Sequence, residues 1–410
     1  MAVMSSMPIA DVRQLQTTAK SNLIAFDPIE EVGFDPHQQK QSLLAQKRAF
    51  TFTNFSLSSG LSLEWVQFGY ECFGRLNEAC DNAILIPHYF TGSSHIAGKY
   101  TDSDPELGYW DSLIGPGRAI DTDRYFVIGV DSLCNVNALN PFVVSTGPTS
   151  VNPETQRAYG RSFPWINLTD SVRAHRRLID ALGIRRLKAV IGPSMGSMSA
   201  LEWAAEFPEM VGCIIGVIGG SFETPAYLVQ ELRQWCLPIL LDPDFQDGKY
   251  RLEAQPRRGL AATLEQVTHS ARSPAWAAQP PMIKGGQFQF SQFEPRTAIE
   301  TLFSTIGYER SAFADANSFL RTARAVQMFS VRQRARRMQC RALWIHAEND
   351  LLSFPSYALE GVQEMRTLGL KVESQVLPGS GGHLDGIFEI QRVGDTIGQF
   401  LDKAEVGSVG

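Results

Sequence analysis

Short runs of apolar residues alternate with amphipathic stretches along most of the chain. Six runs are rich in β-branched or other apolar residues and are bounded by turn residues: Asn82–Pro87, Tyr125–Asp131, Lys188–Pro193, Cys213–Ile218, Ala342–His346 and Lys371–Leu377. Continuous apolar strands that alternate with helical stretches are typical of a largely parallel sheet with helices on both faces. The pattern therefore predicts an α/β fold.

The same pattern divides the chain into four segments. Residues 1–50 are polar, rich in glutamine near their end and without a strong apolar period, so we interpret them as an N-terminal extension. Residues 51–220 and 338–410 carry the predicted strands and form the two parts of the core. The interval 221–337 contains helix formers and aromatic residues but no convincing strand, which predicts one helical insertion rather than a long loop. Ligands of open α/β sheets bind at the carboxyl ends of the strands, so we expect the insertion to cover that edge as a lid.

Composition and charge exclude several classes of protein. The 410 residues include 37 basic and 43 acidic side chains, which are scattered, and this argues against nucleic acid or an anionic membrane as a partner. The six cysteines form no CxxC pair and have no histidine at ligand spacing, so we expect reduced thiols in a cytoplasmic protein and no metal or other bound cofactor. The longest apolar stretch, Val211–Ile218, is far shorter than the ~20 residues of a membrane helix. Met1–Asp27 lacks the pattern of a secretory signal, but its sequence does not exclude an organellar transit peptide.

The segment Leu187–Trp203 carries the strongest chemical signal. It runs from a predicted strand into a predicted helix through Gly192-Pro-Ser194-Met-Gly196. In this context Gly-x-Ser-x-Gly indicates a nucleophile elbow, a strained turn in which small residues let the strand and the helix approach each other. We therefore predict Ser194 as a nucleophile and the backbone N–H of Met195 as an oxyanion donor. A tight turn without chemistry is the alternative, and the flanking strand and helix disfavour it.

A serine nucleophile needs a base and an orienting acid, which follow it as acid and then histidine in this type of fold. Of the seven histidines, only His383 follows an acid at the end of a late predicted strand, and that acid is Asp350. Glu348 and Asp385 compete with Asp350 for the role. The second oxyanion donor should come from the loop after the first predicted strand, where the backbone N–H of Phe90 is the candidate.

Other histidines have structural interpretations. His175 lies among arginines in a predicted helix, so we expect it on a solvated face. His346 lies inside a predicted strand and should be a core residue. His88 and His95 flank the candidate oxyanion loop, and we expect them to hold that loop in shape.

Together with longer motifs, these residues resemble the homoserine O-acetyltransferase family of the α/β-hydrolase superfamily. This family includes serine O-acyltransferases and deacetylcephalosporin C acetyltransferase. The match extends from about residue 52 to about residue 400 and, besides the elbow, contains Asp81–Leu85, Thr91–His95, Tyr109–Trp110, Ile114–Val127, Ser145–Pro153, Tyr159–Gly160, Leu182–Ile184 and Asp315–Phe319. The resemblance implies an α/β-hydrolase fold, a mostly parallel sheet flanked by helices, with an inserted helical lid domain.

The resemblance also implies a ping-pong reaction. Ser194 would take an acetyl or similar acyl group from acyl-CoA, the co-substrate, and His383 would then activate the hydroxyl of homoserine or of a related or larger alcohol. The family's lid carries a Thr-Tyr-Arg-Ser segment whose arginine binds the acceptor carboxylate, and counting from Gly259 places Arg272 at that position. A surface position on the lid is the alternative for Arg272. The resemblance further implies a homodimer formed through the lid.

The chain departs from the family pattern at the substrate-binding positions. Family acyltransferases follow the catalytic histidine with an aspartate that receives the substrate's ammonium group, whereas here Leu384 follows it and Asp385 comes next. Ala271 replaces the tyrosine of the lid segment, and Pro193 and Ser197 replace glycines of the elbow. We keep Leu384 and Asp385 as candidate substrate-binding residues beside the lid arginine. A carboxylic-ester hydrolase with the same nucleophile, acid and base is the alternative function; a non-catalytic scaffold is disfavoured because all three groups are present.

Overall fold

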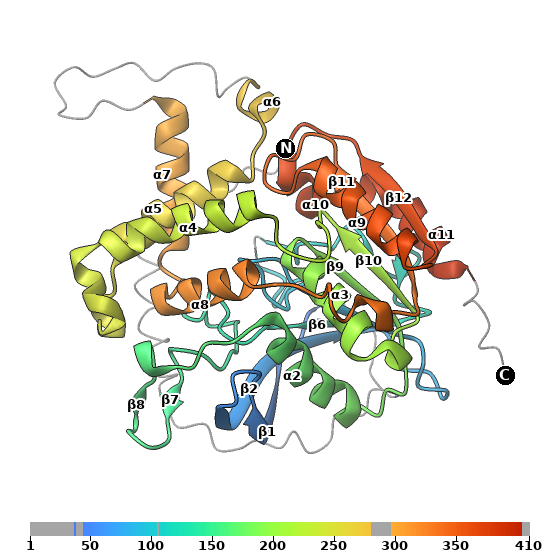
Figure 1. Ribbon diagram of the computed structural model, residues 1–410, viewed down its shortest axis with the longest axis horizontal. Coiled ribbons are helices and arrows are strands. Elements are labelled where there is room, and N and C mark those ends of the chain that lie inside the picture. The colour runs from blue at the N-terminus through green and yellow to red at the C-terminus, as the bar shows by residue number, and fades with distance from the viewer. Residues whose placement is uncertain (1–36, 38–43, 105, 280–296, 404–410) are drawn as a thin grey trace.

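The centre of the molecule is an eight-stranded sheet, seen in a computed structural model that describes residues 37, 44–104, 106–279 and 297–403. Its strand order is β1-β2-β6-β3-β9-β10-β11-β12 (Figure 1). The first two pairings, β1 with β2 and β2 with β6, are antiparallel, and all later pairings are parallel. The strands are β1 (Arg48–Ser56), β2 (Ser62–Phe73), β3 (Ala83–Pro87), β6 (Phe126–Val130), β9 (Leu187–Pro193), β10 (Cys213–Val217), β11 (Arg341–Ala347) and β12 (Val372–Leu377).

The six predicted strands are confirmed as β3, β6, β9, β10, β11 and β12, each within one residue of its predicted bounds. The continuous apolar runs of the first five reflect burial on both faces of the sheet, whereas the edge strand β12 is only partly buried. In β3, Leu85 packs into one hydrophobic cluster and its neighbours Ile84 and Ile86 pack into the other, and all three are fully buried. Helices on both sides exclude water from these faces, which makes the hydrophobic effect the main stabilising contribution here.

Helices flank the sheet on both sides. Residues of α2 (Leu168–Ala181), α3 (Met195–Glu206) and α9 (Pro355–Thr367) contribute to one hydrophobic cluster, and α11 (Gly394–Asp402) contributes to the other. The remaining core elements are short: α10 (Asp385–Phe388) and the strand pairs β4 (Ile114–Gly115) with β5 (Ile120–Asp121) and β7 (Val151–Asn152) with β8 (Arg157–Ala158). The molecule has the α/β-hydrolase fold.

Between β10 and β11 the described residues form five α-helices, which we call the helical insertion. They are α4 (Ala226–Leu241), α5 (Arg257–Ser270), α6 (Pro274–Ala277), α7 (Ala298–Arg310) and α8 (Ala316–Gln327). Helix α5 packs against α4 and α7, and α4 also packs against α8. Figure 1 shows α4, α5 and α7 grouped to one side of the sheet and its covering helices. All five helices lie within the predicted interval 221–337.

The N-terminal extension predicted for residues 1–50 lies largely outside the described residues. Its last part belongs to the core, because β1 begins at Arg48 and the Lys47 ammonium lies 3.0 Å from the buried Glu71 carboxylate. Among the helices that the structure describes, none has the length and hydropathy needed to cross a membrane. The described residues also contain no group of three or more His, Cys, Asp or Glu side chains that could hold a metal ion, and the six cysteines are free.

His175 corrects one prediction. It lies in the core, 1% exposed, on the face of α2 that it shares with Val172 and Ile179, and not on the solvated face where its arginine neighbours led us to expect it. Its Nε2–H donates to the backbone carbonyl of Asp131 at 3.0 Å, and its ring packs edge-on against Phe68. Burial lowers the pKa of His175 to about 4, so the ring is neutral at pH 7.

Candidate active site

Ser194 occupies the sharp turn between β9 and α3. Its φ of 53° and ψ of −117° are strained for a residue with a side chain, and its N–H donates to the carbonyl of Val217 at 2.8 Å. The glycines on either side are required by close backbone approach: a Cβ on Gly192 would lie 2.1 Å from the Gly196 carbonyl oxygen, and one on Gly196 would lie 2.3 Å from the Pro87 carbonyl oxygen. The Gly-x-Ser-x-Gly pattern therefore builds a strained elbow at the carboxyl edge of the sheet.

The two unusual elbow residues fit this turn. Pro193 is the last residue of β9 and is buried. Ser197 is fully buried in α3, and its hydroxyl donates to the carbonyl of Ser194 at 2.6 Å. This hydrogen bond satisfies the buried hydroxyl and ties the first turn of the helix to the elbow.

The structure brings the three predicted catalytic side chains together. The Nε2 of His383 lies 2.8 Å from the Ser194 hydroxyl oxygen, and its Nδ1 lies 2.7 Å from Oδ2 of Asp350. Asp350 is 1% exposed, and its other oxygen accepts the backbone N–H groups of Leu352 and Ser353, each at 2.9 Å. A carboxylate that accepts the Nδ1 proton leaves Nε2 free to accept the proton of the serine hydroxyl. This arrangement can turn Ser194 into a nucleophile.

The two competing acids lie elsewhere. Glu348 is exposed in the loop before Asp350, while both ring nitrogens of His383 already face Asp350 and the serine. Asp385 turns back toward its own loop, where Oδ2 accepts the N–H of Gly381 at 2.9 Å, and burial raises the pKa of this carboxyl group. Asp385 was predicted as a candidate substrate-binding residue, but its side chain does not line the cavity. Consecutive helical residues point about 100° apart, and it is Leu384 that faces the cavity.

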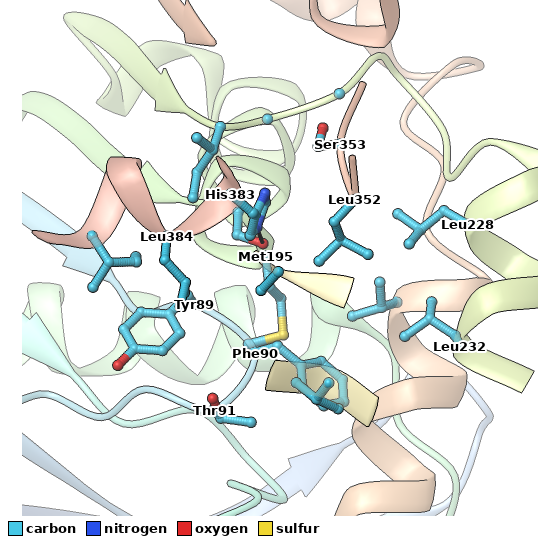
Figure 2. Close-up of a pocket in the computed structure, with 18 of the residues that line it drawn as sticks. Tyr89, Phe90, Thr91, Met195, Leu228, Leu232, Leu352, Ser353, His383 and Leu384 are labelled. Carbon is cyan, nitrogen blue, oxygen red and sulfur yellow. Dashed lines mark hydrogen bonds between the residues drawn. The ribbon is translucent and has the colours of Figure 1, made fainter. Parts of the chain in front are cut away.

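Phe90 and Met195, the candidate oxyanion donors, both line the cavity beside the serine. Met195 is the first residue of α3, so its N–H has no acceptor within the helix. The Phe90 ring is anchored against Trp235 and Phe319, with ring centroids 5.8 and 5.2 Å away. Figure 2 shows Phe90, Met195 and His383 around the same pocket. Two such N–H groups can stabilise the negative oxygen of a tetrahedral intermediate.

His88 and His95 hold the loop that carries Phe90, as predicted. His88 is buried; its Nδ1–H donates to the carbonyl of Tyr89 at 2.6 Å, and its Nε2 accepts the backbone N–H of Ser132 at 3.1 Å. Burial lowers the pKa of His88, which favours this neutral tautomer. The Nδ1 of His95 lies 3.1 Å from a carboxylate oxygen of the buried Glu71. Both histidines therefore act on the shape of the loop.

The cavity in front of Ser194 has a volume of about 240 Å³ and mostly apolar walls. The helical insertion contributes much of the wall, and the segments after β3, β9, β10, β11 and β12 contribute the rest. Figure 2 shows Leu228, Leu232 and Leu352 on one side and Tyr89 and Leu384 on the other. Such a site can bind an apolar acyl chain and keep water from the reacting carbonyl.

Arg272 lines this cavity just after the end of α5. Its guanidinium carbon lies 4.4 Å from the ring centroid of Trp276, and its Nε is buried with no hydrogen-bond partner in the described part of the chain. Burial lowers the pKa of Arg272. The adjacent Ala271 carbonyl accepts the N–H of Leu384 at 3.3 Å, so the segment packs directly against the loop of the catalytic histidine. A substrate carboxylate at this site would supply the partner that the guanidinium lacks.

Sequence reasoning missed a second cationic group in the cavity. Arg310, the last residue of α7, donates from Nη1 to the Thr268 hydroxyl at 2.9 Å and from Nη2 to the Thr91 hydroxyl at 2.6 Å. Thr268 and Thr91 lie 42 and 219 positions away in the sequence. No local motif connects such distant positions, so only the fold reveals this group.

Comparisons with known proteins agree with the fold. A family model described as the α/β hydrolase fold matches residues 156–389. The homoserine O-acetyltransferase of Symbiobacterium thermophilum is 39% identical to this chain, over 85% of this chain and 92% of the relative. The homoserine O-succinyltransferase of Laribacter hongkongensis is 38% identical, over 70% of this chain and 74% of the relative.

Solved structures give the same result. The homoserine O-acetyltransferase from Bacillus anthracis matches with a TM-score of 0.84 and 35% identity, over 89% of this chain and all of that chain. Esterase E22 matches with a TM-score of 0.84 and 38% identity, over 88% of this chain and all of that chain, and its variant with one leucine replaced by aspartate matches with a TM-score of 0.85. The resemblance found in the motifs is confirmed. This chain belongs to the homoserine O-acetyltransferase family, a group of serine-type acyltransferases with the α/β-hydrolase fold.

Proposed function

We propose that this protein is an acyl-CoA-dependent O-acyltransferase that works through a serine acyl-enzyme. Ser194 is the nucleophile, His383 the general base and acid, and Asp350 the group that orients the histidine. The observation that carries this proposal is the single imidazole that lies 2.8 Å from the serine hydroxyl and 2.7 Å from the buried carboxylate. Membership in a family of acyltransferases supports the choice of transfer over other reactions of the same three residues.

In the first half-reaction, His383 accepts the proton of Ser194 as the serine oxygen attacks the thioester carbonyl carbon. The negative oxygen of the tetrahedral intermediate is held by the N–H groups of Phe90 and Met195. The intermediate collapses, the carbon–sulfur bond breaks, and His383 donates its proton to the sulfur. Free CoA leaves, and the acyl group remains on the serine as an ester.

In the second half-reaction, the hydroxyl of the acceptor gives its proton to His383 and attacks the acyl-serine. Collapse of the second tetrahedral intermediate returns that proton to the Ser194 oxygen and releases the ester product. The acceptor is homoserine or a related or larger alcohol, and Arg272 binds its carboxylate. The apolar Leu384 beside the histidine accommodates an acceptor larger than a free amino acid.

The acyl-enzyme gives the direct test. Intact-mass spectrometry after addition of acetyl-CoA or succinyl-CoA should detect the acyl group on the wild-type protein and none on Ser194→Ala. A covalent adduct on the variant would refute the assignment of the nucleophile. Replacement of Arg272 by methionine should raise the KM of the acceptor far more than that of the donor, and equal effects would reject the carboxylate role.

A carboxylic-ester hydrolase is the second candidate. Two observations favour it. Leu384 occupies the cavity position next to the histidine, and the whole chain of esterase E22 matches 88% of this chain. Water would then replace the alcohol in the second half-reaction. Thiol release from acetyl-CoA, measured with and without a panel of alcohols, separates the two. Release that needs an alcohol indicates transfer, whereas release that ignores alcohols indicates hydrolysis.

The helical insertion also supports a homodimer as part of this proposal. Tyr227, Leu241 and Tyr308 are 60%, 76% and 58% exposed on α4 and α7. Burial of these side chains against a second copy would remove this apolar surface from water. Sedimentation velocity should give a dimer for the wild-type protein and a monomer for Leu241→Asp.

A further inference from the structure

The Arg310 guanidinium lies in the substrate cavity without an acidic partner. In the described part of the chain its hydrogen-bond partners are the hydroxyls of Thr268 and Thr91, and it forms no ion pair there. A guanidinium has five N–H donors in a planar fork that matches a carboxylate. Two neutral hydroxyls leave most of this donor capacity unused.

The other charged groups of the cavity do not neutralise Arg310. Glu223 is the one acidic residue that lines the cavity within the described ranges, and its carboxylate pairs with Arg332 at 3.1 Å. The carboxylate of Asp350 faces the catalytic histidine. Arg272 adds a second cationic group to the same cavity. The lining is therefore positively charged, and a partly buried cation without a counter-charge is unfavourable unless a ligand supplies one.

The two threonines differ in what they can offer a ligand. Thr268 donates its own hydroxyl proton to the carbonyl of Leu264 at 2.8 Å, so it serves Arg310 only as an acceptor. The Thr91 hydroxyl accepts from Arg310, and no described group accepts its proton. Thr91 also directly follows Phe90, the candidate oxyanion donor. Guanidinium and hydroxyl donors thus meet close to the carbonyl that reacts.

We propose that Arg310 and Thr91 form a binding site for a substrate carboxylate, so that the cavity selects an anionic substrate that lacks an ammonium group. This inference rests on the proposed function for the reaction that the substrate undergoes. The carboxylate has two possible sources: the acyl group, as the half-ester of a dicarboxylic acid, or the alcohol, as a hydroxy acid whose carboxylate then binds Arg310 in place of Arg272. No unpaired acid of the described cavity lining is available for an ammonium group, which disfavours a free amino acid.

Matched pairs of four-carbon probes test the carboxylate and identify its source. On the acyl side, thiol release from succinyl-CoA is compared with release from butyryl-CoA. On the alcohol side, acetyl transfer to 4-hydroxybutanoate is compared with transfer to 1-butanol and to homoserine. We expect Arg310→Met to lower kcat/KM for the anionic probe of one pair by roughly 10- to 100-fold, the range of a charged hydrogen bond, and to change the neutral probe less than about threefold.

Two further variants separate charge from folding. Arg310→Lys keeps the positive charge and should restore part of the preference for the anionic probe. Arg258→Met removes an exposed arginine of α5 and should leave both probes unchanged. Equal losses for anionic and neutral probes in Arg310→Met, or no loss for either, would overturn the inference.

A binding measurement decides the inference even if no thiol release occurs. Calorimetric titration of Ser194→Ala with 4-hydroxybutanoate and with succinamate should show binding of at least one of them. The Kd should rise at least tenfold in the double variant with Arg310→Met. If neither anion binds, or if both bind the double variant equally well, the carboxylate site is refuted. Absent thiol release together with Arg310-dependent binding would refute only the proposed reaction.

Discussion

Replacement of Asp350 by asparagine tests whether this residue sets the tautomer of His383. Oδ1 of Asp350 accepts the N–H groups of Leu352 and Ser353 at 2.9 Å, so in the variant the amide oxygen must take that position. The amide NH2 group then faces Nδ1 of His383, where a carboxylate oxygen now lies 2.7 Å away. Nδ1 is forced to accept, and the ring proton moves to Nε2. Because Nε2 faces the Ser194 hydroxyl at 2.8 Å, it can no longer take the serine proton.

The expected loss is large and confined to catalysis. The wrong tautomer of the histidine in a Ser-His-Asp triad costs about 10⁴ in kcat, which corresponds to about 5.5 kcal/mol of transition-state stabilisation. The substitution is isosteric and keeps both backbone hydrogen bonds. The free energy of unfolding should therefore change by only about 1–2 kcal/mol, the difference between a charged and a neutral hydrogen bond.

The assay is thiol release from acetyl-CoA, together with urea denaturation of the same preparations. Glu348→Gln is the matched control, because it removes an exposed carboxylate of the same loop and should stay within about twofold of the wild-type rate. A loss of less than tenfold in Asp350→Asn would refute the tautomer argument. A comparable loss in Glu348→Gln would transfer the orienting role to that residue.

Three other substitutions test the elbow, the core and the cavity. Gly196→Ala would place a Cβ 2.3 Å from the Pro87 carbonyl oxygen and should lower the free energy of unfolding by about 1–3 kcal/mol in urea titrations, whereas Gly398→Ala, with its nearest contact at 3.5 Å, should not. The pKa of His175 is about 4 in the folded protein, below its ordinary value of 6.5. Between these two pH values the unfolded chain therefore binds more protons than the folded protein, and the free energy of unfolding should fall by about 3 kcal/mol as the pH falls from 6.5 to 4. Denaturation curves of His175→Gln should lack this contribution, and a parallel pH dependence of the two proteins would show that His175 is charged when folded. Leu384→Asp supplies a carboxylate beside the catalytic histidine and should raise the ratio of kcat/KM for homoserine over that for 4-hydroxybutanoate at least tenfold, or about 1.4 kcal/mol. An unchanged ratio in thiol-release assays would show that this position does not face the acceptor's ammonium group.

The sequence predicted the strands in the middle of the sheet, β3, β6, β9, β10 and β11, which are almost completely buried, and also the more exposed edge strand β12. Every residue of β3 and β6 is buried, so each strand is a continuous apolar run. Strands β1 and β2 were not predicted; most residues of β1 are only half-buried, and both strands lie at the antiparallel end of the sheet. His175 was misplaced because the nearby arginines were weighed above the helical spacing it shares with Val172 and Ile179.

The same reasoning explains which site residues were predictable. Ser194, Asp350 and His383 each follow a strand of the parallel sheet, and the carboxyl ends of parallel strands meet at one edge. The direction of the Asp385 side chain depends on its position within a helical turn, and a shift of one residue rotates that direction by about 100°. Arg310 depends on a contact between α7 and a loop 219 residues earlier in the chain, and such a contact leaves no local pattern.

The core and the helical insertion contribute different residues to the site, but one segment of the insertion also contacts the catalytic loop. The core supplies the nucleophile, base and acid, and the insertion supplies both cavity arginines. The segment around Arg272 also seats the loop of His383, because the Ser273 hydroxyl donates to the Ser380 carbonyl and the Leu384 N–H donates to the Ala271 carbonyl. Changes in this segment should therefore alter kcat as well as KM. Arg310 contacts threonines outside that loop, so its charge can change the choice of substrate while the loop of His383 stays in place.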